Sequence, residues 1–167
     1  MDSSADVGRL MVTLGLDPVI IGATAAMRYR LEPRATVDVD YLVRRLDGLV
    51  EALGERGLDT RVVRDDAGAP YLVIIHGAGV DVDVLLAETD YQRTAIDRAV
   101  DGALSVEDVI VHKLIAWRAK DRDDIDSILA AGHRLDEAYI EHWATAWDVL
   151  DRWREVGGSD LEADAPG

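Results

Sequence analysis

The sequence predicts an α+β fold, with a mixed β-sheet packed by helices and then a helical half. Up to about residue 100, short apolar or alternating runs bounded by Gly, Pro and Asp are typical of strands. Beyond that point, apolar residues recur at helical spacing. We expect one domain over 1–156, with an α/β half of about 1–100, a helical half of about 101–156 and a mobile acidic tail at 157–167.

The composition limits the classes of function. The chain has 167 residues, a formal net charge of −15 and no cysteine, which excludes disulfides and thiolate metal sites. Such a charge disfavours non-specific binding to nucleic acid or to an anionic membrane. No apolar run approaches the ~20 residues that span a bilayer, and the acidic start lacks the features of a signal peptide. We therefore expect a cytoplasmic protein with no membrane partner.

Periodicity and turn residues predict the order of the elements. In the α/β half we expect a helix at Asp6–Leu16, a strand at Val19–Ile21, a short helix at Ala23–Leu31, a strand at Thr36–Val43, a helix from Leu46 to about Gly57, and strands at Thr60–Val63, Tyr71–Ile75 and Val80–Leu86. Further helical segments are expected at Tyr91–Val100, Val106–Trp117, Ile125–Leu129 and Leu135–Val156.

Paired carboxylates on a strand are the strongest chemical signal. Asp38 and Asp40 alternate with Val37, Val39 and Tyr41, so both carboxylates share the face opposite the apolar residues. That face is not ordinary core, because burying two unpaired carboxylates is too costly. Such a pair is suited to a divalent cation and a phosphate-bearing ligand. The simpler alternative is an edge strand with an acidic solvent face.

Two other features extend this signal. Gly22 ends the first strand and opens a helix, where free backbone N–H groups can receive phosphate oxygens. The strand Val80–Leu86 repeats the acidic alternation, with Asp81 and Asp83 on one face.

These motifs in order resemble a known family. The strand–glycine–helix unit followed by Arg-x-Thr-x-Asp-x-Asp resembles the polymerase-β-like nucleotidyltransferase superfamily, and PRATVDVDYLV is most similar to its AbiEii/AbiGii-type branch. That branch includes toxins of type IV toxin–antitoxin systems. VDVDVLL is similar to the family's third-carboxylate strand, and LSVEDVIVHKLIAWRAKDRDDIDSIL resembles its helix with a lysine followed by Arg and Asp-x-x-Asp. The resemblance covers most of Val19–Leu129 and implies a minimal nucleotidyltransferase fold. One departure is Gly22-Ala23, where the family usually has Gly-Gly or Gly-Ser.

The resemblance also implies catalytic and metal-binding roles. Asp38 and Asp40 are expected to hold two Mg²⁺ ions, and Asp83 to share a metal and help remove the acceptor proton. Asp81 lies on the same face as Asp83 and remains its rival. The nucleotide-binding residues implied are Gly22, Ala23, Thr24, Arg34, Lys113, Asp121 and Asp124. Thr24 is the candidate for the hydroxyl that the serine would have supplied.

Some of these residues have simpler explanations. Lys113 lies in an apolar helix, where a lysine can simply reach solvent. Asp121 and Asp124 can form surface ion pairs with Arg118, or can orient Lys113, Arg118 or the nucleotide. Arg34 can bind phosphate or pair with an internal carboxylate.

The resemblance thus predicts a Mg²⁺-dependent nucleotidyltransferase that moves a nucleoside monophosphate from an NTP to an acceptor hydroxyl. The acceptor can be RNA such as a tRNA end, a protein side chain or a small molecule, and the acidic surface argues mildly against RNA. A toxin would imply a cognate antitoxin as partner. The alternative is a non-catalytic protein that keeps the fold as a binding or regulatory partner, which the Gly22-Ala23 departure favours.

Overall fold

The computed structural model describes residues 4–77, 79 and 81–157. The chain forms two compact units, one combining Met1–Ala25 with Arg34–Ser105 and the other combining Ala26–Pro33 with Val106–Gly167. We call them the sheet unit and the helical unit. The tail predicted at 157–167 lies outside the described residues except for Gly157, as does Val80, the predicted start of a strand.

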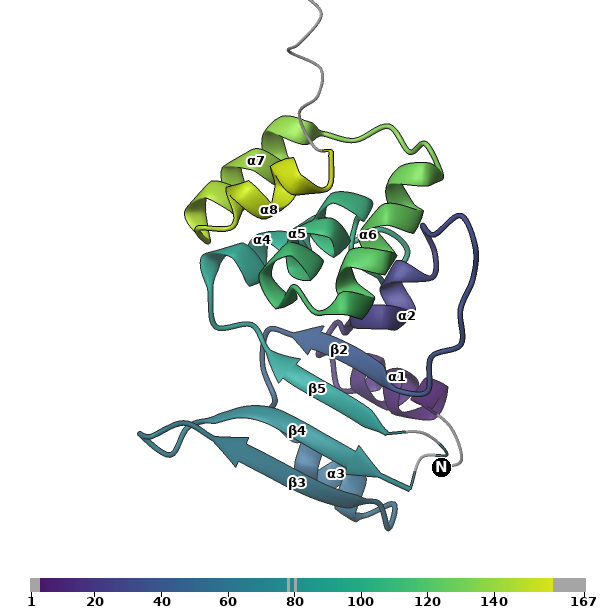
Figure 1. Ribbon diagram of the computed structural model, residues 1–167. Coiled ribbons are helices and arrows are strands. Elements are labelled where there is room, and N and C mark those ends of the chain that lie inside the picture. The colour runs from purple at the N-terminus through teal and green to yellow at the C-terminus, as the bar shows by residue number, and fades with distance from the viewer. Residues whose placement is uncertain (1–3, 78, 80, 158–167) are drawn as a thin grey trace, which may run out of the picture. The chain divides into compact units, whose positions relative to one another are not determined.

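The sheet unit contains a five-stranded sheet of order β1-β2-β5-β4-β3 (Figure 1). The strands are β1 (Val19–Ile21), β2 (Val39–Val43), β3 (Asp59–Arg64), β4 (Pro70–His76) and β5 (Val82–Leu86). Only the pairing of β2 with β5 is parallel among the strand pairs of the described chain. The sheet is therefore mixed, as predicted.

Two helices, α1 (Ser4–Thr13) and α3 (Leu49–Gly54), cover one face of this sheet (Figure 1). The core beneath them is formed by Val7, Leu10, Met11, Leu49 and Leu53 from the helices and by Tyr41, Val43, Val73, Ile75, Val82 and Val84 from the strands. Alternate residues of each strand enter this core, as a side-chain period of two requires. Val37, which we expected on the apolar face, is 71% exposed and takes no part in the core.

The two elements that carry Gly22 and Asp40, α2 (Gly22–Ala26) and β2, are shorter than predicted. The helix α2 ends well before Leu31, because the chain turns after Ala26, whose carbonyl accepts from the amides of Tyr29 and Arg30. The strand β2 begins at Val39 rather than Thr36, since its neighbours pair with it only from Val39 onwards. Asp38 therefore lies just before the strand, not within it.

The remaining helices are α4 (Asp90–Asp97) in the sheet unit and α5 (Val106–Ala116), α6 (Ala119–Ala130), α7 (Glu137–Ala146) and α8 (Leu150–Glu155) in the helical unit. Thr89 and Gln92 form a capping box that starts α4. In the helical unit α5 packs against α6 and α7, and α7 packs against α8. None of the helices in the described ranges is long and apolar enough to cross a membrane.

Candidate functional site

The parallel pair β2–β5 brings two of the predicted carboxylates together. In its register Asp40 is the direct partner of Asp83, so their Cα atoms are separated by about one inter-strand spacing of ~4.8 Å. Both side chains lie on the face opposite the core under α1 and α3, and both residues are half-buried. The sequence predicted each pair of carboxylates, and the resemblance implied that Asp83 shares a metal with Asp38 and Asp40. The strand order that makes Asp40 and Asp83 direct partners is seen only in the fold.

Asp38 lies close enough to this pair for its negative charge to repel that of Asp83. Burial raises the pKa of the Asp83 carboxyl group above its ordinary value, and the nearby charges of Asp38 and Asp81 raise it further, while His76 opposes the shift. Asp38 is itself exposed. A cation placed among these carboxylates would relieve the repulsion, and it would lower the pKa of Asp83.

Gly22 determines where the Asp40 carboxylate lies. The backbone of Gly22 has φ +66°, and a Cβ built on it would lie 2.3 Å from Oδ2 of Asp40. Any side chain at residue 22 would collide with that oxygen, in addition to the strain of the left-handed backbone. Glycine thus allows the Asp40 carboxylate to lie directly against the first residue of α2.

Thr24 supports the segment that carries Asp38. Its hydroxyl donates to the backbone carbonyl of Asp38 at 3.2 Å, and the hydroxyl of Thr36 approaches the same carbonyl at 3.4 Å. The predicted role of Thr24 in binding phosphate therefore has a structural alternative, which is to hold Asp38 in place before β2.

Asp81 differs from Asp83 in its surroundings. Its side chain is 63% exposed, and its Oδ1 lies 3.1 Å from Nδ1 of His76. It precedes β5, and its backbone carbonyl accepts from the amide of Val39. The register thus gives Asp83, and not Asp81, the place beside Asp40.

A Mg²⁺ site must fit these donors. Within residues 4–77, 79 and 81–157, no group of three or more His, Asp or Glu side chains is arranged to hold a metal ion. Mg²⁺ is commonly bound by only one or two carboxylates together with substrate phosphates, and it prefers hard oxygen donors. The Asp40–Asp83 pair with Asp38 nearby fits such a shared site, not a closed site made by protein alone.

The helical unit contains a second set of predicted residues, joined by buried ion pairs. Nζ of Lys113 lies 2.9 Å from Oδ1 of Asp121 and 2.8 Å from Oδ2 of Asp124. The Lys113 side chain is 5% exposed and both aspartates are fully buried. The simpler explanation that Lys113 reaches solvent is therefore excluded, as is a surface ion-pair set for Asp121 and Asp124.

Two arginines extend this group, which we call the buried ion network. Nε of Arg118 lies 2.7 Å from Oδ2 of Asp121, and Nη1 of Arg30 lies 2.7 Å from Oδ1 of Asp124. Burial alone would raise the pKa of Asp121, but hydrogen bonds from Arg118 and Lys113 outweigh it and hold that pKa below its ordinary value. Sequence analysis missed the role of Arg30, which is separated from Asp124 by most of the chain. The only available signal was its place in the cluster Arg28, Arg30 and Arg34.

The two sets of predicted residues belong to different units. Gly22, Ala23, Thr24, Arg34, Asp38, Asp40 and Asp83 lie in the sheet unit, and Lys113, Asp121 and Asp124 lie in the helical unit. Ala23 is half-buried in α2, and Arg34 is half-buried in the segment before β2. That both sets act on one nucleotide stays a prediction.

Comparison with known proteins supports the fold. No family model matches the sequence, and no curated protein matches it. The solution structure of the antibiotic-resistance factor ANT(2'')-Ia is similar, with a TM-score of 0.52 and 18% identity over 90% of this chain and 91% of that chain. An H. pylori protein provisionally named as a nucleotidyltransferase gives a TM-score of 0.48 and 16% identity over 97% of this chain and 84% of its own. The first likeness confirms the predicted nucleotidyltransferase type of α+β fold, and at this identity it concerns the fold alone.

Proposed function

We propose that this protein is a Mg²⁺-dependent nucleotidyltransferase that moves a nucleoside monophosphate from an NTP to an acceptor hydroxyl. The observation that carries the proposal is the pairing of Asp40 with Asp83 on neighbouring parallel strands, beside Gly22 and with Asp38 close enough to perturb Asp83. The fold shared with ANT(2'')-Ia and the motifs that resemble the polymerase-β-like superfamily support it.

Each carboxylate has a role in this proposal. Asp38 and Asp40 would hold up to two Mg²⁺ ions together with phosphate oxygens of the NTP, and Asp83 would share one of these ions. Bound Mg²⁺ would polarise the α-phosphate and neutralise the charge that develops on the leaving pyrophosphate. Asp83 lies beside Asp40 and accepts the proton of the acceptor hydroxyl as a general base.

The buried ion network gives Lys113 a restricted role. An ammonium group has three donors, and two of them are directed at Asp121 and Asp124. We infer that these aspartates fix the position of Lys113, and that any contact of Lys113 with an NTP phosphate uses the remaining donor.

The acceptor and the biological role belong to the proposal as well. The acceptor we propose is a small hydroxyl-bearing molecule or a protein side chain, because the net charge of −15 disfavours RNA. The resemblance to the AbiEii/AbiGii-type branch supports a toxin with a cognate antitoxin. Growth arrest on expression in a bacterial host, abolished by Asp40→Asn, is the outcome expected for a toxin.

A non-catalytic binding protein is the second candidate. It is favoured by Gly22-Ala23, where the family has Gly-Gly or Gly-Ser. This candidate predicts either no NTP binding or binding without transfer.

The test compares thermal unfolding with each NTP in the presence and absence of Mg²⁺. A ligand that binds only the folded state raises the melting temperature by mass action. We expect Mg²⁺ with one NTP to stabilise wild type and Asp66→Asn, an exposed turn variant with the same loss of charge. Asp40→Asn should lose the stabilisation, and transfer of an α-labelled phosphate should follow the same pattern. Equal stabilisation of Asp40→Asn would exclude the assigned site.

A further inference from the structure

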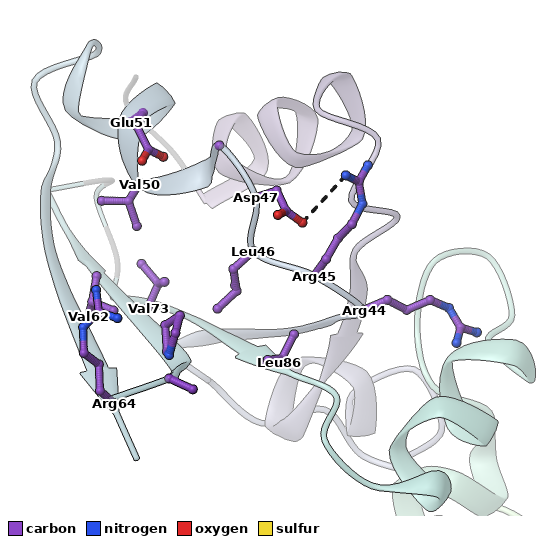
Figure 2. Close-up of a pocket in the computed structure, with 13 residues that line it drawn as sticks. Arg44, Arg45, Leu46, Asp47, Val50, Glu51, Val62, Arg64, Val73 and Leu86 are labelled. Carbon is purple, nitrogen blue, oxygen red and sulfur yellow. Dashed lines mark ion pairs between the residues drawn. The ribbon is translucent and has the colours of Figure 1, made fainter. Parts of the chain in front are cut away.

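A pocket of about 670 Å³ lies in the sheet unit (Figure 2), and none of Asp38, Asp40 and Asp83 lines it. It is formed by the connection from β2 to α3, the first turn of α3, the start of β4 and the ends of β3 and β5. Figure 2 shows Leu46, Val73 and Leu86 near its middle. Val73 is fully buried, and Leu46 and Leu86 are half-buried, so the floor of the pocket is apolar.

The pocket and the candidate active site lie at opposite ends and on opposite faces of the parallel pair β2–β5. Asp40 and Asp83 lie near the start of these strands, whereas the pocket begins where the strands end, at Leu86 and Arg44. Val73 pairs with Val84 and belongs to the face under α3, while Asp83 points to the other face. The pocket is therefore not part of the site assigned to the NTP.

Of the charged residues that line this pocket, three already have charged partners. Arg44 pairs with Asp97, and Figure 2 shows its side chain extending away from the middle of the pocket. Nη1 of Arg45 lies 3.8 Å from Oδ2 of Asp47, and its Nη2 donates to the carbonyl of Gly15 at 3.0 Å. These three side chains are satisfied without a ligand.

The other two charged residues, Arg64 and Glu51, have no ion-pair partner among the residues that the structure describes. Nη1 of Arg64 donates to the carbonyl of Gly68 at 3.0 Å, and a guanidinium has five donors, so most of its donors remain for a ligand. In Figure 2 Glu51 and Arg64 lie above and below Val50 and Val62 on one side of the pocket. An apolar floor thus lies beside one cation and one anion that are both exposed and that have no ion-pair partner among the described residues.

From this arrangement we propose that the pocket binds a small zwitterion with an apolar body, an apolar amino acid or dipeptide. Arg64 would receive the carboxylate as a bidentate donor, and Glu51 would receive the ammonium group. The apolar side chains of the ligand would cover Leu46, Val73 and Leu86. The volume lies in the usual range of about 300–1,000 Å³ for small-molecule sites, and the opposite charges on the rim disfavour a polyanion.

The experiment uses four probes with the full chain. These are Leu-Leu, N-acetyl-Leu-Leu without the ammonium charge, Leu-Leu amide without the carboxylate charge, and free leucine. Binding is measured by calorimetry and by NMR shifts of the methyl groups of Val62, Val73 and Leu86. We expect each blocked dipeptide to bind about tenfold more weakly than Leu-Leu, because one charge-assisted contact is lost. Tighter binding of free leucine than of Leu-Leu would identify an amino acid, and the reverse a dipeptide.

Variants link each charge to its residue. The affinity of Arg64→Met for Leu-Leu should be no higher than the affinity of wild type for Leu-Leu amide. The affinity of Glu51→Gln for Leu-Leu should be no higher than the affinity of wild type for N-acetyl-Leu-Leu. Arg56→Met and Glu55→Gln change the same charges at the end of α3 outside the pocket and should leave affinity unchanged. The proposal is overturned by absence of binding at millimolar probe, by equal binding of blocked and free dipeptides, or by equal losses in the control variants.

Discussion

At Gly22 the absence of a side chain allows the Asp40 carboxylate to lie against the start of α2. A methyl group at this residue would meet two penalties, a left-handed backbone at φ +66° and a contact of 2.3 Å with Oδ2 of Asp40. The first penalty is common to many glycines, and the second is specific to the candidate site. The two can be separated by comparison with a glycine that has the same backbone but open space around it.

Gly57 is such a residue, with φ +73° and no atom within 4 Å of a built Cβ. We expect Gly57→Ala to destabilise the protein by about 1–2 kcal/mol, the cost of the left-handed backbone alone. Gly22→Ala should cost more and should also displace Asp40, which would abolish Mg²⁺-dependent NTP binding. Chemical denaturation and ligand-induced melting shifts measure the two effects. Similar unfolding free energies for the two variants, with NTP binding kept, would contradict the role given to Gly22.

The negative charge of Asp83 should lower the stability of the folded protein once this carboxyl group has ionised. Its pKa in the folded protein is raised, so the folded state favours the protonated form, and stability falls as pH rises from the ordinary carboxyl pKa through the raised value. Above the raised pKa, the Asp83 carboxyl group of the folded protein carries an unfavourable negative charge. Asp83→Asn should therefore melt at a higher temperature than wild type at pH 7, and the difference should shrink on acidification to about pH 3.

The same variant should lose transfer while keeping much of its NTP affinity, because Asp83 is assigned to the acceptor hydroxyl. Asp81→Asn is the matched control, since Asp81 faces His76 and is 63% exposed. It should retain transfer and show a smaller change in melting temperature. Activity in Asp83→Asn combined with inactivity in Asp81→Asn would reverse the assignment.

At the scale of elements, the buried ion network joins α5 and α6. Lys113 lies in α5, and Asp121 and Asp124 lie in α6. The side chains of all three residues are almost completely buried. Removing one member of a buried ion pair typically costs about 3–5 kcal/mol, because its partner stays buried without compensation. The network therefore makes the packing of α6 on α5 sensitive to single substitutions.

Lys113→Met should destabilise the helical unit by about 3 kcal/mol, at the low end because Arg118 and Arg30 still pair with the two aspartates. Lys120→Met removes the only other lysine of the chain from an exposed position and should be nearly neutral. All four tryptophans follow Val106, so their fluorescence reports unfolding of the helical unit. Equal unfolding curves for the two variants would show that the network contributes little.

The elements also show what sequence reasoning can predict. Alternation identified β2 and β5, because a half-buried strand must alternate its faces. A continuous apolar run identified β4, and helical spacing identified α5 and α7. The short helix α2 was predicted too long, since nothing local marks the turn after Ala26. Pairings distant in sequence, such as Asp40 with Asp83 and Arg30 with Asp124, depend on strand order and tertiary packing, which no local pattern encodes.

At the scale of the whole molecule, charge repulsion should oppose folding. The chain has 33 acidic against 18 basic residues, and carboxylates such as Asp38, Asp81 and Asp83 interact unfavourably. Salt screens such repulsion, because the Debye length falls from about 30 Å at 0.01 M to about 3 Å at 1 M. We expect the melting temperature to rise with NaCl over this range.

KCl at equal ionic strength is the control, and it should give the same rise, since screening does not depend on the identity of the monovalent cation. MgCl₂ should add a further rise in wild type that is smaller in Asp40→Asn. A melting temperature that falls with NaCl would mean that favourable ion pairs outweigh the repulsion.

The residues Ala26–Pro33 belong to the helical unit, although the chain on both sides of them belongs to the sheet unit. The helical unit is therefore assembled from two stretches of sequence, and a single cut before Val106 does not release it whole. A fragment starting there would lack Arg30, whose side chain is only 8% exposed and pairs with Asp124. The fully buried carboxylate of Asp124 would then have one cationic partner fewer. Gene fusion or domain exchange at that boundary would carry the same defect. A transplantable version of the helical unit therefore needs Ala26–Pro33 grafted onto it.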